Sequence, residues 1–146
     1  MYDDILIPTD GSDTIPETLT HGLAIADDND ATVHALYVVD SRVTAAADDE
    51  TGTDLQHSLE NEGRAAVADV EARATEDGLE TVSDVRQGTP SKTILQYADE
   101  QDIDLIVIGT RGKSPREKLT SLGSVSERVV DNASVPVFVV RNAGDE

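Results

Sequence analysis

Residues 105–112 read Leu-Ile-Val-Ile-Gly-Thr-Arg-Gly, and this stretch decides the fold class. A short run of apolar residues that ends at a glycine is typical of a strand buried on both faces of a parallel sheet. Similar runs lie at Ile5–Ile7, Val33–Val39 and Val137–Val140, and Val82–Val85 is read as a further short strand. Segments with apolar residues at helical spacing separate them. The pattern predicts an α/β fold, a three-layer sandwich around a five-stranded parallel sheet, formed by one domain over residues 1–146.

The segments between these runs predict four helices. The first spans about Ser12–Ala26, and the second carries apolar residues from Leu55 to Ala74 and is closed by Gly78. Thr89 is expected to cap a third helix that begins at Pro90, and Ser124 opens the fourth. Residues 40–54 are rich in alanine, aspartate and threonine and are expected to form a loop.

The glycines after the fourth strand are candidates for a phosphate site. Gly109 and Gly112 follow that strand directly, and Gly123 and Ser124 precede a helix. Glycine lets backbone N–H groups turn toward a ligand, and a helix start adds further donors and the positive end of a dipole. The same glycines also suit plain turns, with Ser124 as a helix cap only.

Three further features lie where the same site is expected, at the carboxyl ends of the strands. Arg111, Lys113, Arg116 and Lys118 form a local concentration of positive charge, which suits a polyphosphate or, alternatively, a solvated loop beside acidic residues. Asp10 follows the first strand and offers a carboxylate to a ribose hydroxyl or an adenine amine, or serves the turn alone. Val38, near the end of the second strand, offers apolar surface to a purine or belongs to the core.

Composition excludes several classes of function. The chain has 30 acidic and 11 basic residues, a formal net charge of −19, which repels nucleic acid and anionic membranes. Repulsion of this size is tolerable in molar salt, so we expect the cytoplasm of a halophile; an ordinary acidic mesophilic protein is the alternative. No cysteine is present, which removes thiol chemistry, and no apolar stretch is long enough to span a membrane. The first residues lack the basic region of a signal peptide, so a cytoplasmic location is expected.

Five segments together resemble the universal stress protein family. They are Pro8-Thr9-Asp10-Gly11-Ser12, Tyr37-Val38-Val39-Asp40, residues 104–112, Gly123-Ser124-Val125 and Val135-Pro136-Val137. They occur in the order of the family and extend over essentially the whole chain. The resemblance implies the strand order 3-2-1-4-5, and a homodimer that pairs through Val137–Val140.

The family contains members that bind ATP, and their glycine pattern resembles the one in this chain. By that resemblance, adenine and ribose are surrounded by Pro8, Thr9, Asp10 and Val38. Ribose and phosphates are held by Gly109, Gly112, Gly123, Ser124 and Val125. From the local charge concentration, Arg111 is expected to add positive charge beside them. The family pattern places nine residues between the second and third glycines, whereas ten separate Gly112 from Gly123 here. The extra residue either bulges outward or moves Gly123 away from the phosphates.

The expected function is therefore an ATP-binding, dimeric regulatory protein of the stress response. No base that would activate water lies beside the predicted phosphates, so binding, with slow hydrolysis at most, is expected rather than rapid turnover. Mg²⁺ is expected to accompany the triphosphate. The alternative is a nucleotide-free dimeric scaffold of the same fold. A flavin carrier is a further alternative, although the chain has no tryptophan and few aromatic rings to stack on a flavin.

Overall fold

The computed structural model describes residues 2–11, 15–41, 49–110 and 124–141, with the backbone alone at 49–53 and 124. Its parallel strands are β1 (Asp4–Pro8), β2 (Thr32–Asp40), β3 (Thr81–Gly88), β4 (Leu105–Gly109) and β5 (Val137–Val140). Its helices are α1 (Ile15–Asn29), α3 (Asp49–Glu76), α4 (Pro90–Glu100) and α5 (Ser124–Asn132). The strands form one sheet in the order β3-β2-β1-β4-β5, which confirms the expected fold.

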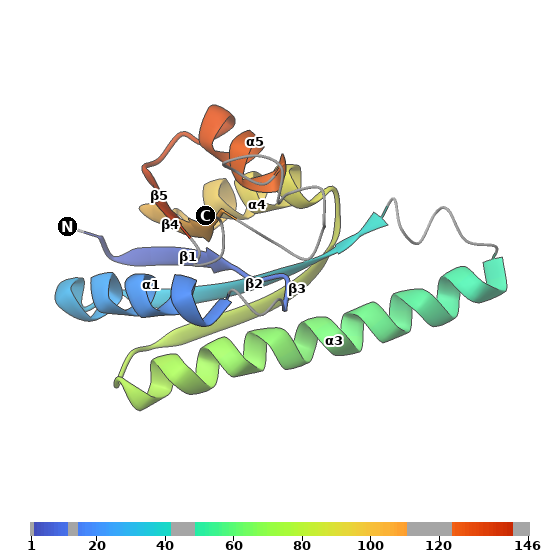
Figure 1. Ribbon diagram of the computed structural model, residues 1–146, viewed down its shortest axis with the longest axis horizontal. Coiled ribbons are helices and arrows are strands. Elements are labelled where there is room, and N and C mark those ends of the chain that lie inside the picture. Colours follow the sequence, from blue (N-terminus) through green and yellow to red (C-terminus); the bar gives the residue numbers. More distant parts are fainter. Residues whose placement is uncertain (1, 12–14, 42–48, 111–123, 142–146) are drawn as a thin grey trace.

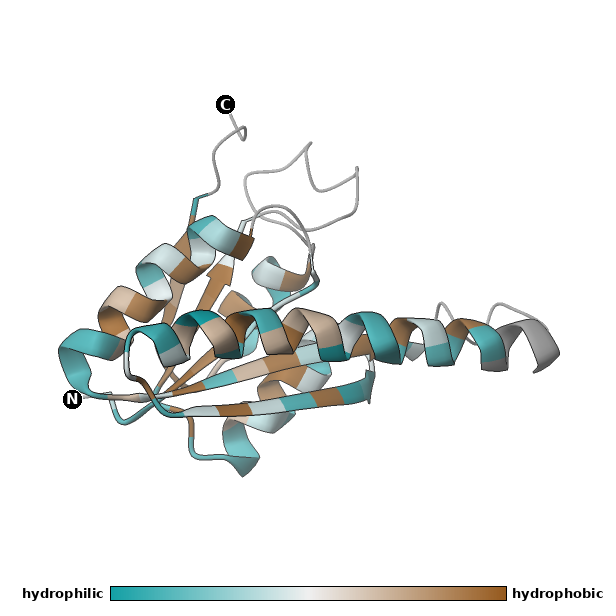
Figure 2. Ribbon diagram, turned by 90° about the horizontal axis from the view of Figure 1, so that it is seen from below, coloured by the Kyte–Doolittle hydropathy of each residue, from teal (hydrophilic) through white to brown (hydrophobic). Residues whose placement is uncertain are grey.

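Two helices cover each face of the sheet (Figure 1). Because side chains alternate along a strand, Ile5 and Ile7 of β1 pack under α1 and α3, whereas Leu6 packs under α4 and α5. Apolar residues gather on the strands between the two helix layers (Figure 2). Among the helices that the structure describes, none has both the length and the apolar character that crossing a membrane requires.

Two predicted boundaries were wrong. Helix α3 begins at Asp49, so residues 49–54 are helical where a loop was expected. Acidic residue types such as Asp49 and Glu50 favour a helix N-terminus, and this preference outweighs the cost of Gly52. Strand β3 continues past Val85 to Gly88 because its last residues still pair with β2, up to Asp40. Residues 42–48 of the expected loop lie outside the described residues.

The start of α4 confirms one expectation and corrects another. Pro90 is the first helical residue, where its missing N–H costs nothing. Thr89 occupies the cap position with an extended backbone, but its side chain makes no capping hydrogen bond. Thr89 instead stabilises the start of α4 through its backbone carbonyl, which accepts a hydrogen bond from the Thr93 N–H at 2.9 Å.

Three helices end in a left-handed residue, and only one of the three is glycine. After α3, Gly78 has φ 78°, and the Leu79 N–H donates to the Ala74 carbonyl at 3.0 Å, as in a Schellman motif. After α1 and α4, the same position is taken by Asp30 with φ 53° and Asp102 with φ 52°. Aspartate carries a Cβ into this region and adds negative charge at the negative end of the helix dipole.

Replacing Asp102 with glycine should therefore raise the free energy of unfolding by about 0.5–1 kcal/mol. The gain comes from relief of the left-handed backbone and loss of the unfavourable charge, reduced by the greater freedom of glycine in the unfolded chain. Urea unfolding at constant KCl measures it. Asp69→Gly, at an exposed position inside α3, is the control and should gain nothing. Equal effects of the two substitutions would contradict this explanation.

Candidate functional site

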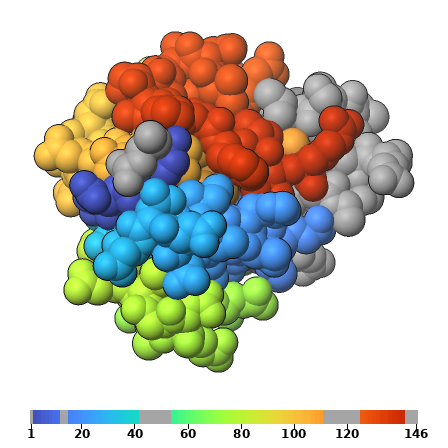
Figure 3. All heavy atoms as spheres, turned by 90° about the vertical axis from the view of Figure 1, so that its left-hand side faces the viewer, coloured from blue at the N-terminus to red at the C-terminus, as the bar shows by residue number. Residues whose placement is uncertain are grey.

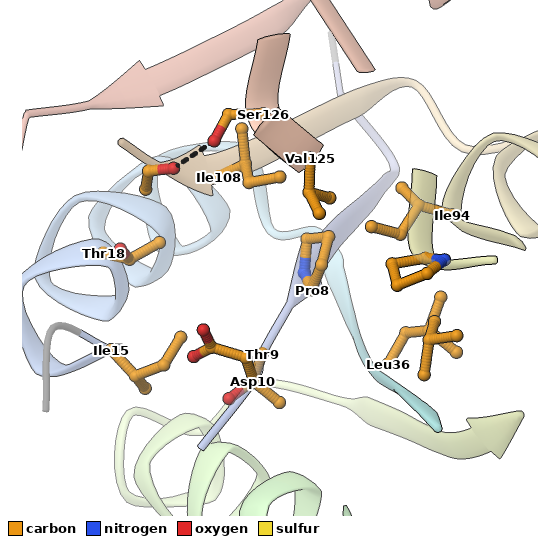
Figure 4. Close-up of a pocket in the computed structure, with 13 residues that line it drawn as sticks. Pro8, Thr9, Asp10, Ile15, Thr18, Leu36, Ile94, Ile108, Val125 and Ser126 are labelled. Carbon is orange, nitrogen blue, oxygen red and sulfur yellow. Dashed lines mark hydrogen bonds between the residues drawn. The ribbon is translucent and has the colours of Figure 1, made fainter. Parts of the chain in front are cut away.

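A pocket of about 160 Å³ opens at the carboxyl ends of β1, β2 and β4. β2 pairs with one edge of β1, and β4 pairs with its other edge. The strand order therefore reverses between β1 and β4, and parallel sheets bind ligands at such a topological switch point. Figure 4 shows the pocket with Pro8 near its centre and side chains from α1 and α5 around it.

Six residues that the sequence singled out line this pocket. They are Pro8, Thr9, Asp10, Val38, Gly109 and Val125. Ser124 begins α5, next to Val125, and only its backbone is described. Arg111, Gly112 and Gly123 lie outside the described residues, as do Lys113, Arg116 and Lys118.

Seven further residues, not predicted from the sequence, also line the pocket. They are Ile15, Thr18, Leu36, Pro90, Ile94, Ile108 and Ser126. Spacing could have found some of them: Leu36 precedes Val38 by two residues on a strand, so both side chains lie on the same sheet face. Ile94 follows Pro90 by one helical turn, which places both on the same face of α4.

The wall formed by β2, β4 and α4 is apolar and buried. Leu36 is fully buried, and Ile94 and Ile108 are almost so. Together with Val38 and Val125 they offer aliphatic side chains, and no charged group, to a ligand. A wall of this kind suits a flat, weakly polar ring rather than a phosphate or a sugar.

The backbone of Val38 is directed into the same space. The Leu36 carbonyl accepts from the Thr9 N–H at 2.8 Å, so the polar groups of Leu36 point toward β1. Backbone direction repeats every two residues along a strand, and hence the N–H and C=O of Val38 point to the same side. The last β1 residue that pairs with β2 is Pro8, opposite Leu36. The polar groups of Val38 therefore face the space beyond the end of β1.

A tight turn after β1 brings polar groups to the opposite wall. Thr9 is buried, and its hydroxyl oxygen accepts from the Gly11 N–H at 3.1 Å. Gly11 has φ 73°, a conformation that glycine adopts readily. The turn places the partly buried Asp10 at the pocket, beside Ile15 and the buried Thr18 of α1 (Figure 4).

Two hydrogen bonds fix the end of β4. The Ser126 hydroxyl donates to the Gly109 carbonyl at 2.8 Å, drawn as the dashed line in Figure 4. The Thr110 N–H donates to the Val140 carbonyl at 3.0 Å. Gly109 is thus tied to the first turn of α5, whose N-terminal N–H groups have no partner within the helix. This arrangement holds potential anion donors beside the pocket.

A buried polar network lies beneath the apolar wall, between the sheet and α4. The Tyr97 hydroxyl lies 2.7 Å from His34 Nδ1, and His34 Nε2 lies 2.9 Å from an Asp4 carboxylate oxygen. The carboxylate can only accept, so Nε2 carries a hydrogen, and in the neutral imidazole Nδ1 then accepts from the tyrosine hydroxyl. Burial, reinforced by the negative charge of Asp84, raises the pKa of Tyr97. The phenol therefore remains a donor at neutral pH.

Arg86 closes this network at the surface. Its guanidinium lies 4.7 Å from the centre of the Tyr97 ring and binds Asp84 and Glu100 at 2.8 and 2.7 Å. The hydrogen bonds to Asp84 and then to Glu100 raise the pKa of Arg86 above its usual value. Tyr97 lies on α4 one turn after Ile94, so the network fixes the helix that supplies the apolar wall.

Comparison with known proteins assigns the family. A model of the Universal stress protein family matches residues 1–141. Universal stress protein MJ0531 of Methanocaldococcus jannaschii is 40% identical over 147 residues, covering 100% of this chain and 86% of the relative. The solved structure of MJ0577 from the same organism has a TM-score of 0.88 at 29% identity and covers 99% of both chains.

A universal stress protein from Archaeoglobus fulgidus, solved in complex with dAMP, has a TM-score of 0.70 at 22% identity and covers 95% of this chain and 98% of its own. At this identity the likeness extends to the fold alone. The family model and MJ0531 both match nearly the full length of this chain, and the observed strand order is the one that the resemblance implied. The chain therefore belongs to the universal stress protein family.

Proposed function

We propose that this chain binds ATP in the pocket at the ends of β1, β2 and β4 and acts as a regulatory protein of the stress response. The observation that carries the proposal is the pairing of an apolar wall with the backbone of Val38. The wall offers Leu36, Ile94 and Ile108 to the faces of a purine. The Val38 N–H and C=O supply one donor and one acceptor for its edge, as adenine requires.

The sugar and phosphates would extend from this wall toward Asp10 and α5. Asp10 is the one carboxylate among the described residues that line the pocket. The N-terminus of α5, from Ser124 onward, offers backbone donors and a positive dipole end to the phosphates. Arg111, Gly112 and Gly123 would complete the phosphate site. Mg²⁺ would arrive bound to the triphosphate, because the described residues contain no group of three or more acidic or histidine side chains that could hold a metal.

The acidic composition of the chain indicates the salt concentration at which ATP binding should be measured. A net charge of −19 is best tolerated in a cytoplasm with molar KCl, where the Debye length falls to about 3 Å. The solved dAMP complex is a property of the Archaeoglobus fulgidus protein. For this chain, support comes from its own pocket, and ATP binding should be measured by calorimetry in molar KCl. A protein that releases no adenine nucleotide on denaturation and gives no heat with ATP would exclude the proposal.

The same titration should distinguish adenine from guanine. Guanine carries the acceptor O6 where adenine carries the donor N6–H₂, so the Val38 carbonyl would face another acceptor. An unpaired polar group in a buried site costs about 1–3 kcal/mol, so GTP should bind roughly 5- to 150-fold more weakly than ATP. The control is adenosine against guanosine, which lack phosphates and should show the same preference. Equal binding of the two bases would remove Val38 from the proposed role.

We also propose a homodimer that pairs through the edge of β5 that meets no other strand among the described residues. Phe138 is 41% exposed beside His21 of α1, and Val130 of α5, on the opposite face of the sheet, is 40% exposed. Exposed apolar residues at such a strand edge suit pairing with a second chain. A nucleotide-free scaffold would use this edge alone and not the pocket, and the two proposals therefore have separate tests.

A further inference from the structure

Two neighbouring pairs of side chains connect β2 to α4. Leu36 and Ile94 form the first pair, which belongs to one buried cluster and lines the pocket. His34 precedes Leu36 by two residues on β2, so both side chains lie on the same face of the sheet. Tyr97 follows Ile94 by about one turn on the same side of α4. The second pair, His34 and Tyr97, therefore holds α4 to the sheet next to the pair that forms the pocket wall.

This second pair is polar and buried. His34 is 4% exposed and Tyr97 is 1% exposed, and their rings meet edge to face with centres 5.7 Å apart. The Tyr97 hydroxyl lies 2.7 Å from His34 Nδ1, its one hydrogen-bond partner among the described residues. Salt screens buried electrostatic interactions far less than exposed ones, so the pair should persist in molar KCl.

A proton from solvent has access to this pair through Asp4. The Asp4 side chain is 34% exposed and lies 2.9 Å from His34 Nε2. Figure 3 shows the N-terminal segment (dark blue) at the surface beside the residues that connect α4 to β4 (orange-yellow), in agreement with the hydrogen bond from Asp4 N–H to Asp104. Histidine is the side chain that ordinarily gains a proton between about pH 5 and 8. The other two histidines of the chain, His21 and His57, are exposed.

Protonation of His34 would remove the acceptor of the Tyr97 hydroxyl. Both ring nitrogens of an imidazolium carry hydrogen, so Nδ1 becomes a donor and the hydroxyl has to turn and accept from it. The hydroxyl hydrogen then has no acceptor among the described residues, and an unpaired polar group in a buried place is costly. Tyr97 regains a partner in water only when α4 moves away from β2.

Charged groups from β1, β3, α4 and the segment before β4 lie around the pair. They are four carboxylates, of Asp4, Asp84, Glu100 and Asp104, and one guanidinium, of Arg86. Arg86 holds Asp84 and Glu100 at 2.8 and 2.7 Å, so both of these carboxylates are already paired. The surroundings are net negative, and a protonated His34 would keep its charge-assisted hydrogen bond to Asp4.

We propose that Tyr97 and His34 position the pocket wall for the base of the ligand, and that protonation of His34 releases this wall and weakens binding. The proposal rests on the proposed binding of an adenine nucleotide in this pocket. Neither residue lines the pocket, so both are positioning residues that act through Ile94 and Leu36. A fall in pH would thereby release the nucleotide.

A pH titration of adenosine binding tests this proposal. Adenosine is the probe because the terminal phosphate of ATP itself gains a proton near about pH 6. Calorimetry in molar KCl gives the affinity from about pH 8 down to the lowest pH at which circular dichroism shows the folded protein. Nuclear magnetic resonance of the histidine rings, without ligand, gives the neutral fraction of His34 at each pH. The affinity should fall in proportion to that fraction, hence about tenfold where about one tenth of His34 is neutral.

Three variants locate the effect. Tyr97→Phe removes the hydroxyl that protonation leaves unpaired and keeps the ring against Arg86, so its affinity for adenosine should not change with pH. His34→Gln cannot gain a proton in this range and should also lose the pH response, which provides the same test if Tyr97→Phe does not fold. His57→Gln, at an exposed position of α3, is the matched control and should keep the full response.

The outcomes separate this proposal from the proposed function. Adenosine binding that is equal at every pH would overturn the positioning role and leave nucleotide binding in place. A His34 ring that stays neutral throughout, or an unchanged pH response in the folded Tyr97→Phe or His34→Gln variant, would do the same. No adenosine binding at any pH would instead exclude the base site, and the positioning role with it.

Discussion

Val38→Phe should weaken ATP binding at least about a hundredfold. Val38 lies on the apolar wall with Leu36, and its side chain faces the space assigned to adenine. A phenyl ring at this position would occupy the volume that the base needs. The buried neighbours Leu36 and Ile94 leave it little room to turn aside. Isothermal titration calorimetry with ATP in molar KCl measures the loss.

Val82→Phe is the control for this substitution. Val82 lies on the neighbouring strand β3, on the same face of the sheet as His34, its partner in the register. It is 43% exposed and does not line the pocket. A phenylalanine at this position should leave the affinity for ATP unchanged. If both variants bind ATP as the unsubstituted chain does, adenine lies elsewhere and the proposed pocket is wrong.

Thermal unfolding separates loss of the site from loss of the fold. Val38 is partly buried, so the larger side chain is expected to cost about 1–3 kcal/mol through overpacking, and a folded variant should still unfold cooperatively. Addition of ATP should raise the midpoint of unfolding for the unsubstituted chain and for Val82→Phe, but not for Val38→Phe. A rise in all three would contradict the assignment.

Most of the strands could be predicted from the sequence because their burial leaves a simple pattern. β1, β4 and β5 carry consecutive apolar residues, as in Leu105–Ile108, which is typical of parallel strands covered on both faces. β3 at the sheet edge reads Thr-Val-Ser-Asp-Val-Arg-Gln-Gly and lacks this pattern. Boundaries were harder because they depend on partners distant in the sequence. Strand β3 extends to Gly88 because Asp40 pairs with it, and no local pattern around Gly88 reports this pairing.

Helix ends show a similar limit. Gly78 indicated its helix end correctly, because glycine tolerates the left-handed backbone that this position requires. Asp30 and Asp102 adopt the same conformation, which aspartate does not predict as glycine does. Hydrogen bonds such as that from Ile103 N–H to the Ala98 carbonyl, 3.0 Å long, hold the chain there. Tertiary packing of the following strand decides these positions.

The candidate site was predictable where residues follow a strand end. Pro8, Thr9 and Asp10 reach the pocket because β1 ends beside it, and this position follows from strand order alone. Thr18 could not be selected in this way, because it lies on a helix whose rotation about its axis depends on packing against the sheet. The role of Val38 is a further example, since its backbone rather than its side chain is proposed to recognise the ligand.

Val139→Pro should convert the proposed dimer into a monomer while leaving the sheet intact. The carbonyls of Pro136 and Val140 accept from Ile106 N–H and Thr110 N–H, both at 3.0 Å, so these residues point toward β4. Backbone direction alternates along a strand, and the polar groups of Val137 and Val139 consequently point away from the sheet. Proline at 139 removes an outward N–H and costs no hydrogen bond to β4.

The expected shift is from the mass of a dimer to that of a monomer, measured by sedimentation equilibrium in molar KCl. Loss of paired backbone hydrogen bonds in both chains, together with poorer packing at Phe138, should weaken association at least about a hundredfold, or about 2.7 kcal/mol. Ser83→Pro is the control: the Glu80 carbonyl accepts from Val33 N–H, so Ser83, three residues later, points outward from the opposite edge of the sheet. It should leave the mass unchanged. A dimer that survives Val139→Pro but is lost in Ser83→Pro would place the interface on β3, and a monomer in the unsubstituted chain would remove the dimer from the proposed function.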